Sequence, residues 1–214
     1  MNLLKTDRDT QRFSTRRLEA LTDGVFAIAM TLLVLDLHVS DIGRAATNHE
    51  LWEGLQAMQL NIISFVVSFL LLGSMWAVHV RQFEYIKQAD RRLTMINTLR
   101  LLAVVLIPFT TSLSATYPDI ALARVIFPIN FFLLALVSFW QWDYATRKEN
   151  KLYEKLSAAE LRRGRLRNLT VVYMAALVSV GALFIGEWAF LLFALMPIAI
   201  NTIAGYVKDG KKTI

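Results

Sequence analysis

An aspartate inside an apolar stretch near the N-terminus is the first residue whose type raises a question of chemistry. Asp23 falls within 18–39, a stretch long enough, at about 1.5 Å per helical residue, to cross a hydrocarbon core of roughly 30 Å. An acid inside a membrane span is costly and normally has a partner. Hydrogen bonding or ion pairing with another polar group of the inner half is therefore expected. The candidate partners are Arg17, His79, Asn97 and Arg100.

The same stretch has an apolar stripe that points away from Asp23. At about 100° per residue, Asp23 lies roughly 140° from Ile28 around the helix axis. One narrow sector holds Ile28, Thr31, Leu32 and Leu35. One face of this helix could therefore line something, while the other face must bury a charge.

Each of these residues also has a plainer interpretation. An apolar stripe on a membrane helix commonly faces lipid or packs against a neighbour. The Thr31 hydroxyl could return to the carbonyl group four residues earlier. A second acid, Asp36, stands at the outer end of the stretch and could be a solvated helix end. The residues alone leave both interpretations open.

The elements that must position these residues are membrane helices. With 56% hydrophobic residues in only 214, the chain is too apolar for an ordinary soluble domain. We predict an all-α membrane protein with one domain over 1–214. Its six transmembrane helices are expected at about 18–39, 51–80, 93–115, 120–142, 169–185 and 188–207. Prolines interrupt three of them, at Pro108, Pro128 and Pro197. The polar segment 144–168 permits a short surface helix.

The basic residues predict the orientation of these helices. The N-terminus, the 81–92 linker, the 144–168 segment and the C-terminal tail together hold 20 of the 23 Lys and Arg. Such a bias places both termini in the cytoplasm. The net charge of +6 is explained by this distribution, so nucleic acid is not an expected partner, whereas the lipid bilayer is.

Several functional classes are disfavoured by what the spans contain. The chain has no cysteine, and His79 has no second His or Cys at ligand spacing, so neither a metal site nor a cofactor is expected. The polar inventory inside the spans is too small for a nucleophile, base or metal set, so the chain is not expected to be an enzyme.

Three segments of the chain resemble the transmembrane-protein-175 family of potassium channels. The stretch Arg17-Leu-Glu-Ala-Leu-Thr-Asp23 is similar to the family's first-helix signature, an Arg, three residues, then Phe-Ser-Asp. Here Leu21 replaces the Phe and Thr22 the Ser. The second segment holds Trp76, His79 and Phe83, and the third is Asn97-Thr-Leu-Arg with Leu106-Ile-Pro-Phe. The helix count agrees with single-repeat prokaryotic members, which assemble as tetramers around the first helix.

This resemblance implies a homotetrameric potassium channel of a prokaryotic inner (plasma) membrane, with potassium as the permeant ion. Nothing in the chain resembles a Thr-Val-Gly-Tyr-Gly filter. The implied hydrophobic constriction falls on Ile28, with Leu32 and Leu35 above it. Thr31 would offer oxygen to a partly dehydrated ion, and four copies of Asp36 would attract cations at the outer mouth.

The resemblance also assigns a structural role to the inner half of the helix. It implies that Arg17, Thr22 and Asp23 hydrogen-bond with Trp76 and His79 and so fix the first helix to its neighbours. Two other classes of function stay open. A secondary transporter is expected to have broken helices or paired halves, and a non-conducting assembly protein would leave the Ile28 stripe as packing.

Overall fold

Five helices long and apolar enough to cross a membrane occur in the part of the chain that the structure describes. This structure is a computed structural model that describes residues 12–147, 149, 150, 152–154, 156–185 and 192. Its elements are β1 (Phe13–Ser14), α1 (Arg16–Leu32), η1 (Leu33–Asp36), η2 (Val39–Ile42), α2 (Asn48–Ala57), α3 (Gln59–Phe83), β2 (Gln88–Ala89), α4 (Arg91–Thr116), α5 (Ala121–Thr146) and α6 (Ala158–Ile185). The predicted all-α membrane class is confirmed. Apart from Leu192, the expected span 188–207, with Pro197, lies outside the described residues.

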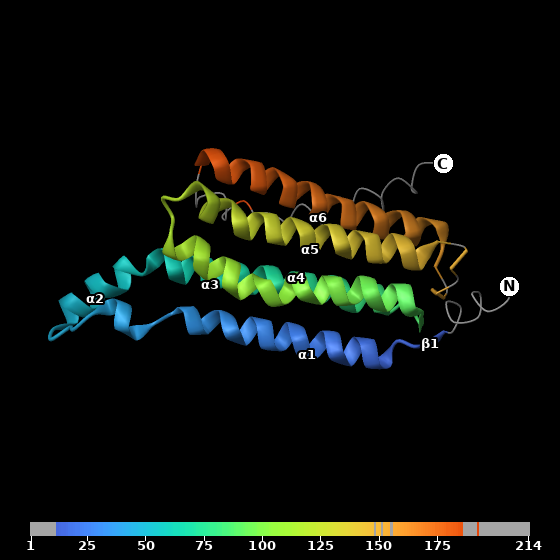
Figure 1. The fold of residues 1–214 in the computed structure, drawn as a ribbon, viewed down its shortest axis with the longest axis horizontal. Helices are drawn as coiled ribbons and strands as arrows, with labels where there is room; N and C mark the ends of the chain where they lie inside the picture. Colours follow the sequence, from blue (N-terminus) through green and yellow to red (C-terminus); the bar gives the residue numbers. More distant parts are fainter. Residues whose placement is uncertain (1–11, 148, 151, 155, 186–191, 193–214) are drawn as a thin grey trace, which may run out of the picture.

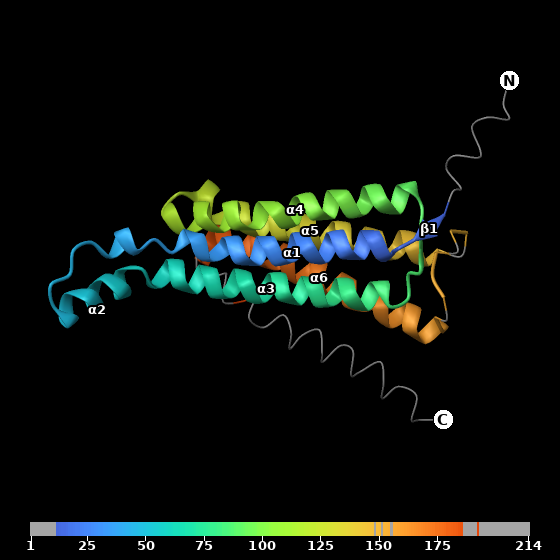
Figure 2. The same cartoon turned by 90° about the horizontal axis from the view of Figure 1, so that it is seen from below.

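The five long helices run side by side along the long axis of the molecule (Figure 1). In the view from below, α1 lies in front of α3 and α4 (Figure 2), the two long helices against which it packs. The short helix α2, with η2 before it, extends beyond the end of the bundle (Figures 1 and 2), whereas η1 continues α1 within the bundle. We call the other end, where α1, α4 and α6 begin, the basic end.

Two helices begin earlier than predicted because polar side chains cap them. Ser157 accepts a hydrogen bond from the Glu160 amide (3.2 Å), and the Glu160 carboxylate accepts one from the Ser157 amide (2.8 Å). This capping box starts α6 at Ala158, so one long helix replaces the expected surface helix and the span at 169–185. Thr47 likewise accepts from the Glu50 amide (3.2 Å) and starts α2, and the expected helix 51–80 is divided at Met58 into α2 and α3.

The interruptions expected at Pro108 and Pro128 do not occur. Both α4 and α5 continue through their prolines. A proline removes one helical hydrogen bond and crowds the carbonyl of the preceding turn, but neighbouring side chains can satisfy such groups. Close to these prolines, Asn130 donates to the Ala103 carbonyl (3.1 Å) and Ser114 donates to the Ala123 carbonyl (2.5 Å), each one residue before the carbonyl that the proline leaves without its amide, so these bonds join α4 to α5. The described spans therefore lack the broken helices that a transporter is expected to have.

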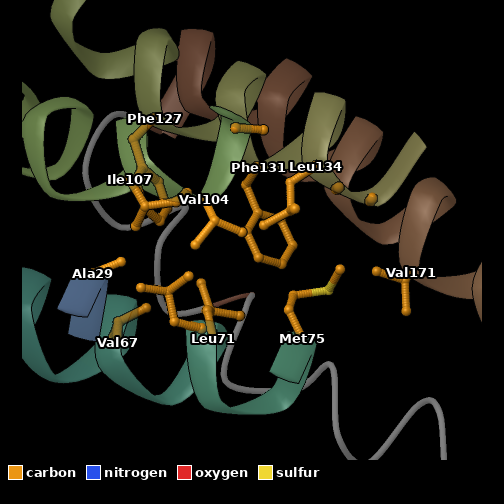
Figure 3. Packing of buried hydrophobic residues seen from close by; sticks show 14 of the residues in the cluster. Ala29, Val67, Leu71, Met75, Val104, Ile107, Phe127, Phe131, Leu134 and Val171 are labelled. Atoms are coloured by element: carbon orange, nitrogen blue, oxygen red, sulfur yellow. The ribbon is translucent and has the colours of Figure 1, made fainter. Parts of the chain in front are cut away.

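The main core lies between α3, α4 and α5, and α1 and α6 each bury one side against it. Leu71 and Met75 of α3 point toward Val104 of α4 and Phe131 of α5 (Figure 3). A second cluster closes the basic end, where β1 pairs antiparallel with β2. Since α1 joins the core along one side only, no described residue covers its other side.

Candidate functional site

The outward side of α1 is the candidate site, and it holds every residue of the predicted stripe. Ile28 is 61% exposed and Leu35 64%, and both Thr31 and Leu32 are exposed between them. Small residues share this side. A Cβ added to Gly24 would meet nothing within 4 Å. The stripe is thus an unobstructed surface of the single chain.

Thr31 and Asp36, the two polar residues near the stripe, differ in how exposed they are to solvent. The Thr31 hydroxyl donates to the Ile28 carbonyl (2.8 Å), so its proton is occupied while its oxygen can still accept. Asp36, at the end of η1, is half-buried, and its backbone carbonyl lies 3.3 Å from Nδ1 of His38. Thr31 therefore presents an oxygen on the exposed side, whereas Asp36 is partly withdrawn from it.

The opposite side of α1 is fixed by apolar packing. Phe26, Ala29 and Leu33 are almost fully buried and belong to the main core. Their spacing of three and four residues places them on one face. Because this face is buried against α3 and α4, the Ile28 side must point away from the bundle.

Asp23 has a neutral partner. The Trp76 indole Nε1–H of α3 donates to its carboxylate oxygen Oδ1 at 2.9 Å. Asp23 is exposed and Trp76 is 42% exposed, so this hydrogen bond lies at the edge of the α1–α3 contact. Arg17 is exposed and, within the described part of the chain, makes no hydrogen bond to Asp23. Asp23 therefore bonds to Trp76, one of the two partners that the family resemblance implied. None of the partners suggested by the residues alone, Arg17, His79, Asn97 and Arg100, takes that place.

A chain of buried amides joins α1 to α4 and α5. The Asn97 amide nitrogen donates to the Thr22 hydroxyl (3.0 Å), and the Gln141 amide nitrogen donates to the Asn97 carbonyl oxygen (3.1 Å). The Thr22 hydroxyl in turn donates to the Leu18 carbonyl (2.8 Å). All three amide and hydroxyl side chains are fully buried. Thr22 thus bonds to Asn97, and not to Trp76 or His79.

Arg100 is a fully buried cation at the end of this chain. Its Nη1 donates to Gln141 Oε1 (3.2 Å) and lies 2.9 Å from His79 Nδ1, and its Nη2 donates to the Met75 carbonyl (3.3 Å). The guanidinium carbon lies 5.6 Å from the centroid of the Phe26 ring, within cation–π range. Among the described residues, the guanidinium has no carboxylate partner, so neutral oxygens, the imidazole and a ring face hold its charge.

Gln141 was missed by sequence reasoning. A polar amide inside the predicted span 120–142 was the available signal, because such groups commonly hydrogen-bond across membrane helices. The described residues contain no cluster of three or more His, Cys, Asp or Glu side chains that could hold a metal ion. The arrangement therefore combines a buried polar network behind α1 with an apolar, open surface in front of it.

A comparison with curated proteins decides the family. A potassium channel of Streptomyces collinus is 36% identical over 155 residues, which cover 71% of this chain and 74% of the relative. The chain belongs to the TMEM175 family. The family model, described as "Endosomal/lysosomal potassium channel TMEM175", matches residues 17–108, which begin at Arg17 of the signature. The resemblance drawn from the sequence is confirmed, and the TMEM175 family is one of ion channels, not enzymes.

Other TMEM175 relatives agree in fold and differ in name. A potassium channel of Chamaesiphon minutus is 31% identical over 160 residues, covering 71% of this chain and 75% of the relative. A crystal structure described as a lysosomal potassium-selective channel TMEM175 homolog from Chamaesiphon minutus matches with a TM-score of 0.63 and 26% identity, over 93% of this chain and 98% of that one. A zebrafish (Danio rerio) relative, 25% identical over 94% of this chain, is named an endosomal/lysosomal proton channel, and the match spans 38% of its length.

Proposed function

We propose that this protein is a potassium-selective channel that assembles as a homotetramer around α1. Ions pass down their electrochemical gradient through a hydrophobic constriction formed by Ile28, with Leu32 and Leu35 on its outer side and no carbonyl filter. The protein spans the inner (plasma) membrane of a prokaryotic cell, with both termini in the cytoplasm. The bilayer, the other subunits and potassium ions are its partners.

The observation that carries this proposal is the uncovered side of α1. Only 28% of the apolar window of α1 is buried inside the single chain, against 44–50% for α3, α4 and α5. One helix cannot enclose a pore, so copies related by rotational symmetry are required. A face whose apolar residues Ile28, Leu32 and Leu35 are exposed in succession along the outer half of the span is suited to line the axis of such an assembly.

The window of α6 is as little buried as that of α1, but its open side has a different character. It carries large side chains, with Tyr173 68% and Phe184 81% exposed, which suit contact with lipid chains. The open side of α1 includes Ala20, Gly24 and Ala27. Small residues let helices approach closely within a membrane, so α1 is the better candidate for contact between subunits.

A ring of Ile28 side chains would sort ions by how readily they lose water. Methyl groups offer an ion no ligand, so passage requires retained hydration or a widened ring. Potassium sheds water at lower cost than sodium, which favours potassium at a narrow apolar neck. The exposed Thr31 oxygen, one turn outward, could accept a partly dehydrated ion, and closure could be dewetting of the same ring. Asp36, although half-buried, would add negative charge at the outer mouth.

The orientation rests on the distribution of basic residues. Within the described residues, the basic end carries most of the Lys and Arg, whereas the opposite end has Arg44 and Arg124. Positive residues in short loops favour the cytoplasmic side. This supports a cytoplasmic N-terminus, with α2 on the outer side.

The test is ion flux into liposomes that contain the purified protein. Potassium flux should follow the imposed gradient without a second solute, and strict coupling to another solute would favour a transporter. No flux under any gradient would favour an assembly protein. Because the animal relatives are named proton channels, proton flux is the second candidate function, and a pH-sensitive dye in the same liposomes measures it.

Ile28→Asn tests the constriction. A polar ring should hydrate more easily and reduce the preference for potassium over sodium, by about tenfold if the apolar ring contributes roughly 1.4 kcal/mol to the difference. Leu102→Asn is the matched control, because Leu102 of α4 is 57% exposed but lies off the proposed pathway. An unchanged selectivity ratio in Ile28→Asn, or an equal loss in the control, would contradict the assignment.

A further inference from the structure

A pocket at the basic end lies between the last turn of α5 and the first turns of α6, away from the α1 surface. Its volume is about 350 Å³, within the lower range of ligand sites in proteins. It is lined by Trp142, Asp143, Thr146, Arg147, Leu161, Arg162 and Arg165. Three guanidinium groups and one carboxylate leave it with net positive charge.

The carboxylate uses only part of the donor capacity of the arginines. Arg147 donates to Asp143 through Nε (3.2 Å) and Nη2 (2.8 Å), and Arg165 Nη2 lies 3.5 Å from the other Asp143 oxygen. A guanidinium has five N–H donors. The side chains of Arg147 and Arg165 are 58% and 63% exposed, so each can donate to a second anion.

The charges in the pocket are oriented and persistent. Hydrogen bonding to Asp143 raises the pKa of Arg147 above its ordinary value, so this group stays protonated. Arg162 is exposed one turn from the start of α6 and adds a third cation. Asp143 thus orients two guanidinium groups and neutralises one of the three positive charges. The remaining positive charge and unused N–H donors suit an anion with several acceptor oxygens.

The apolar part of the pocket is built by a close helix contact. Trp142 is almost fully buried and packs edge-on against Tyr85, with ring centroids 6.4 Å apart. A Cβ at Gly164 would lie 2.3 Å from the Trp142 ring atom Cζ2, so the glycine allows α6 to pass directly over the indole. Leu161 and Trp142 therefore give the pocket an apolar wall beneath its arginines.

The pocket lies at the ends of two helices that are long and apolar enough to cross a membrane, so in the proposed orientation it would lie near the lipid headgroups. It joins the end of one apolar span, Ala121–Thr146, to the start of another, Ala158–Phe184. Tryptophan is enriched at this depth, and guanidinium groups bind phosphate oxygens in paired hydrogen bonds. Basic pockets between membrane helices on the cytoplasmic side suit anionic lipid headgroups.

We propose that this pocket binds the phosphate of an anionic phospholipid headgroup, with Arg147, Arg162 and Arg165 as its donors. The headgroup would sit against the arginines while its glycerol and first acyl carbons contact Leu161, which lies beside the buried Trp142 ring. This site is separate from the proposed ion pathway, and its occupancy does not depend on conduction.

The test measures lipid binding to the full-length protein in detergent by native mass spectrometry. Phosphatidylglycerol is compared with phosphatidylcholine, and inorganic phosphate is the soluble competitor. Arg162→Gln/Arg165→Gln should weaken phosphatidylglycerol binding by at least about tenfold, because two charged donors to the phosphate are lost. Arg44→Gln/Arg91→Gln removes the same charge at two exposed sites outside the pocket and should leave binding unchanged.

A second variant gives a result in the opposite direction. Asp143→Asn removes the competing carboxylate, so phosphatidylglycerol binding should strengthen, which misfolding cannot produce. Equal weakening in the pocket and control variants, no preference over phosphatidylcholine, or no gain in Asp143→Asn would each overturn the site. If millimolar inorganic phosphate displaces phosphatidylglycerol, the pocket recognises the phosphate group of the lipid. If the protein binds inorganic phosphate but not phosphatidylglycerol, the lipid assignment is overturned.

Discussion

Asn97 links α1 to the rest of the bundle, and replacing it tests whether the buried amides hold α1 in place. Its side chain donates to Thr22 of α1 and accepts from Gln141 of α5. Asn97→Leu keeps the number and branching of the side-chain heavy atoms and removes both hydrogen bonds. The Thr22 hydroxyl keeps its bond to the Leu18 carbonyl, whereas the Gln141 amide loses an acceptor inside a buried site.

The cost of Asn97→Leu follows from these contacts. Two interhelical hydrogen bonds within a membrane contribute about 0.6 kcal/mol each on average. An unsatisfied buried donor at Gln141 adds roughly 1–3 kcal/mol. The free energy of unfolding should therefore fall by about 2–4 kcal/mol. Ser68→Ala is the control, since it removes a single buried interhelical bond to Thr111 (2.9 Å) and should cost about 1 kcal/mol.

Unfolding by sodium dodecyl sulfate, followed by circular dichroism, measures both free energies in the same mixed micelles. Hydrogen exchange then locates the effect, because the amides of α1 should exchange faster in Asn97→Leu while those of α5 and α6 change little. If Asn97→Leu were no more destabilising than Ser68→Ala, or if exchange rose equally in every helix, the amide chain would not be what fixes α1.

Three further substitutions test other contacts. Gly164→Ala should destabilise the protein by about 1–3 kcal/mol through overpacking against Trp142, although alanine is the better helix former, and a rise in melting temperature would contradict the close approach. A Cβ at Gly24 would meet nothing within 4 Å, so Gly24→Leu should reduce the subunit stoichiometry measured by light scattering without lowering monomer stability, whereas Val180→Leu on α6 should leave the stoichiometry intact. Trp76→Phe keeps an aromatic ring but removes the donor to the α1 carboxylate, and it should cost about 1 kcal/mol in the exposed setting of the monomer. A larger cost in the assembled protein alone would indicate that subunit contact buries this hydrogen bond.

The five long helices were largely predictable from the apolar runs, but their ends, the short helix α2, the two 3-10 turns and the β1–β2 pair were not. Helix α6 starts at Ala158 because of its capping box, and the Ser-Ala-Ala-Glu pattern at 157–160 is readable in the sequence. It was overlooked because charge dominates 144–168, and a charged helix end looks like a surface segment. The pocket between α5 and α6 is lined by the first turns of α6. A prediction that starts the helix at 169 therefore contains no such pocket.

The candidate site was predictable in part, because spacing along α1 determines which residues share a face. The partners across helices were harder to predict. Arg17 precedes Asp23 by six residues on the same helix, a spacing that does not bring two side chains together, whereas the choice of Trp76 over other donors depends on how far α1 is rotated against α3. The role of Gln141 depends in the same way on α5 lying beside α4. Contacts of this kind are set by tertiary packing and are absent from the spacing of any one helix.

The two faces of α1 are linked by geometry. Burial of Phe26, Ala29 and Leu33 against the core and the hydrogen bond at Thr22 together fix the rotation of the helix about its axis. At about 100° per residue, this rotation turns Ile28 outward whatever lies beyond it. The polar network therefore need not touch an ion to affect conduction. If the Ile28 face lines the pathway, loosening Asn97 would let the helix rotate and change selectivity while leaving every residue of the stripe in place.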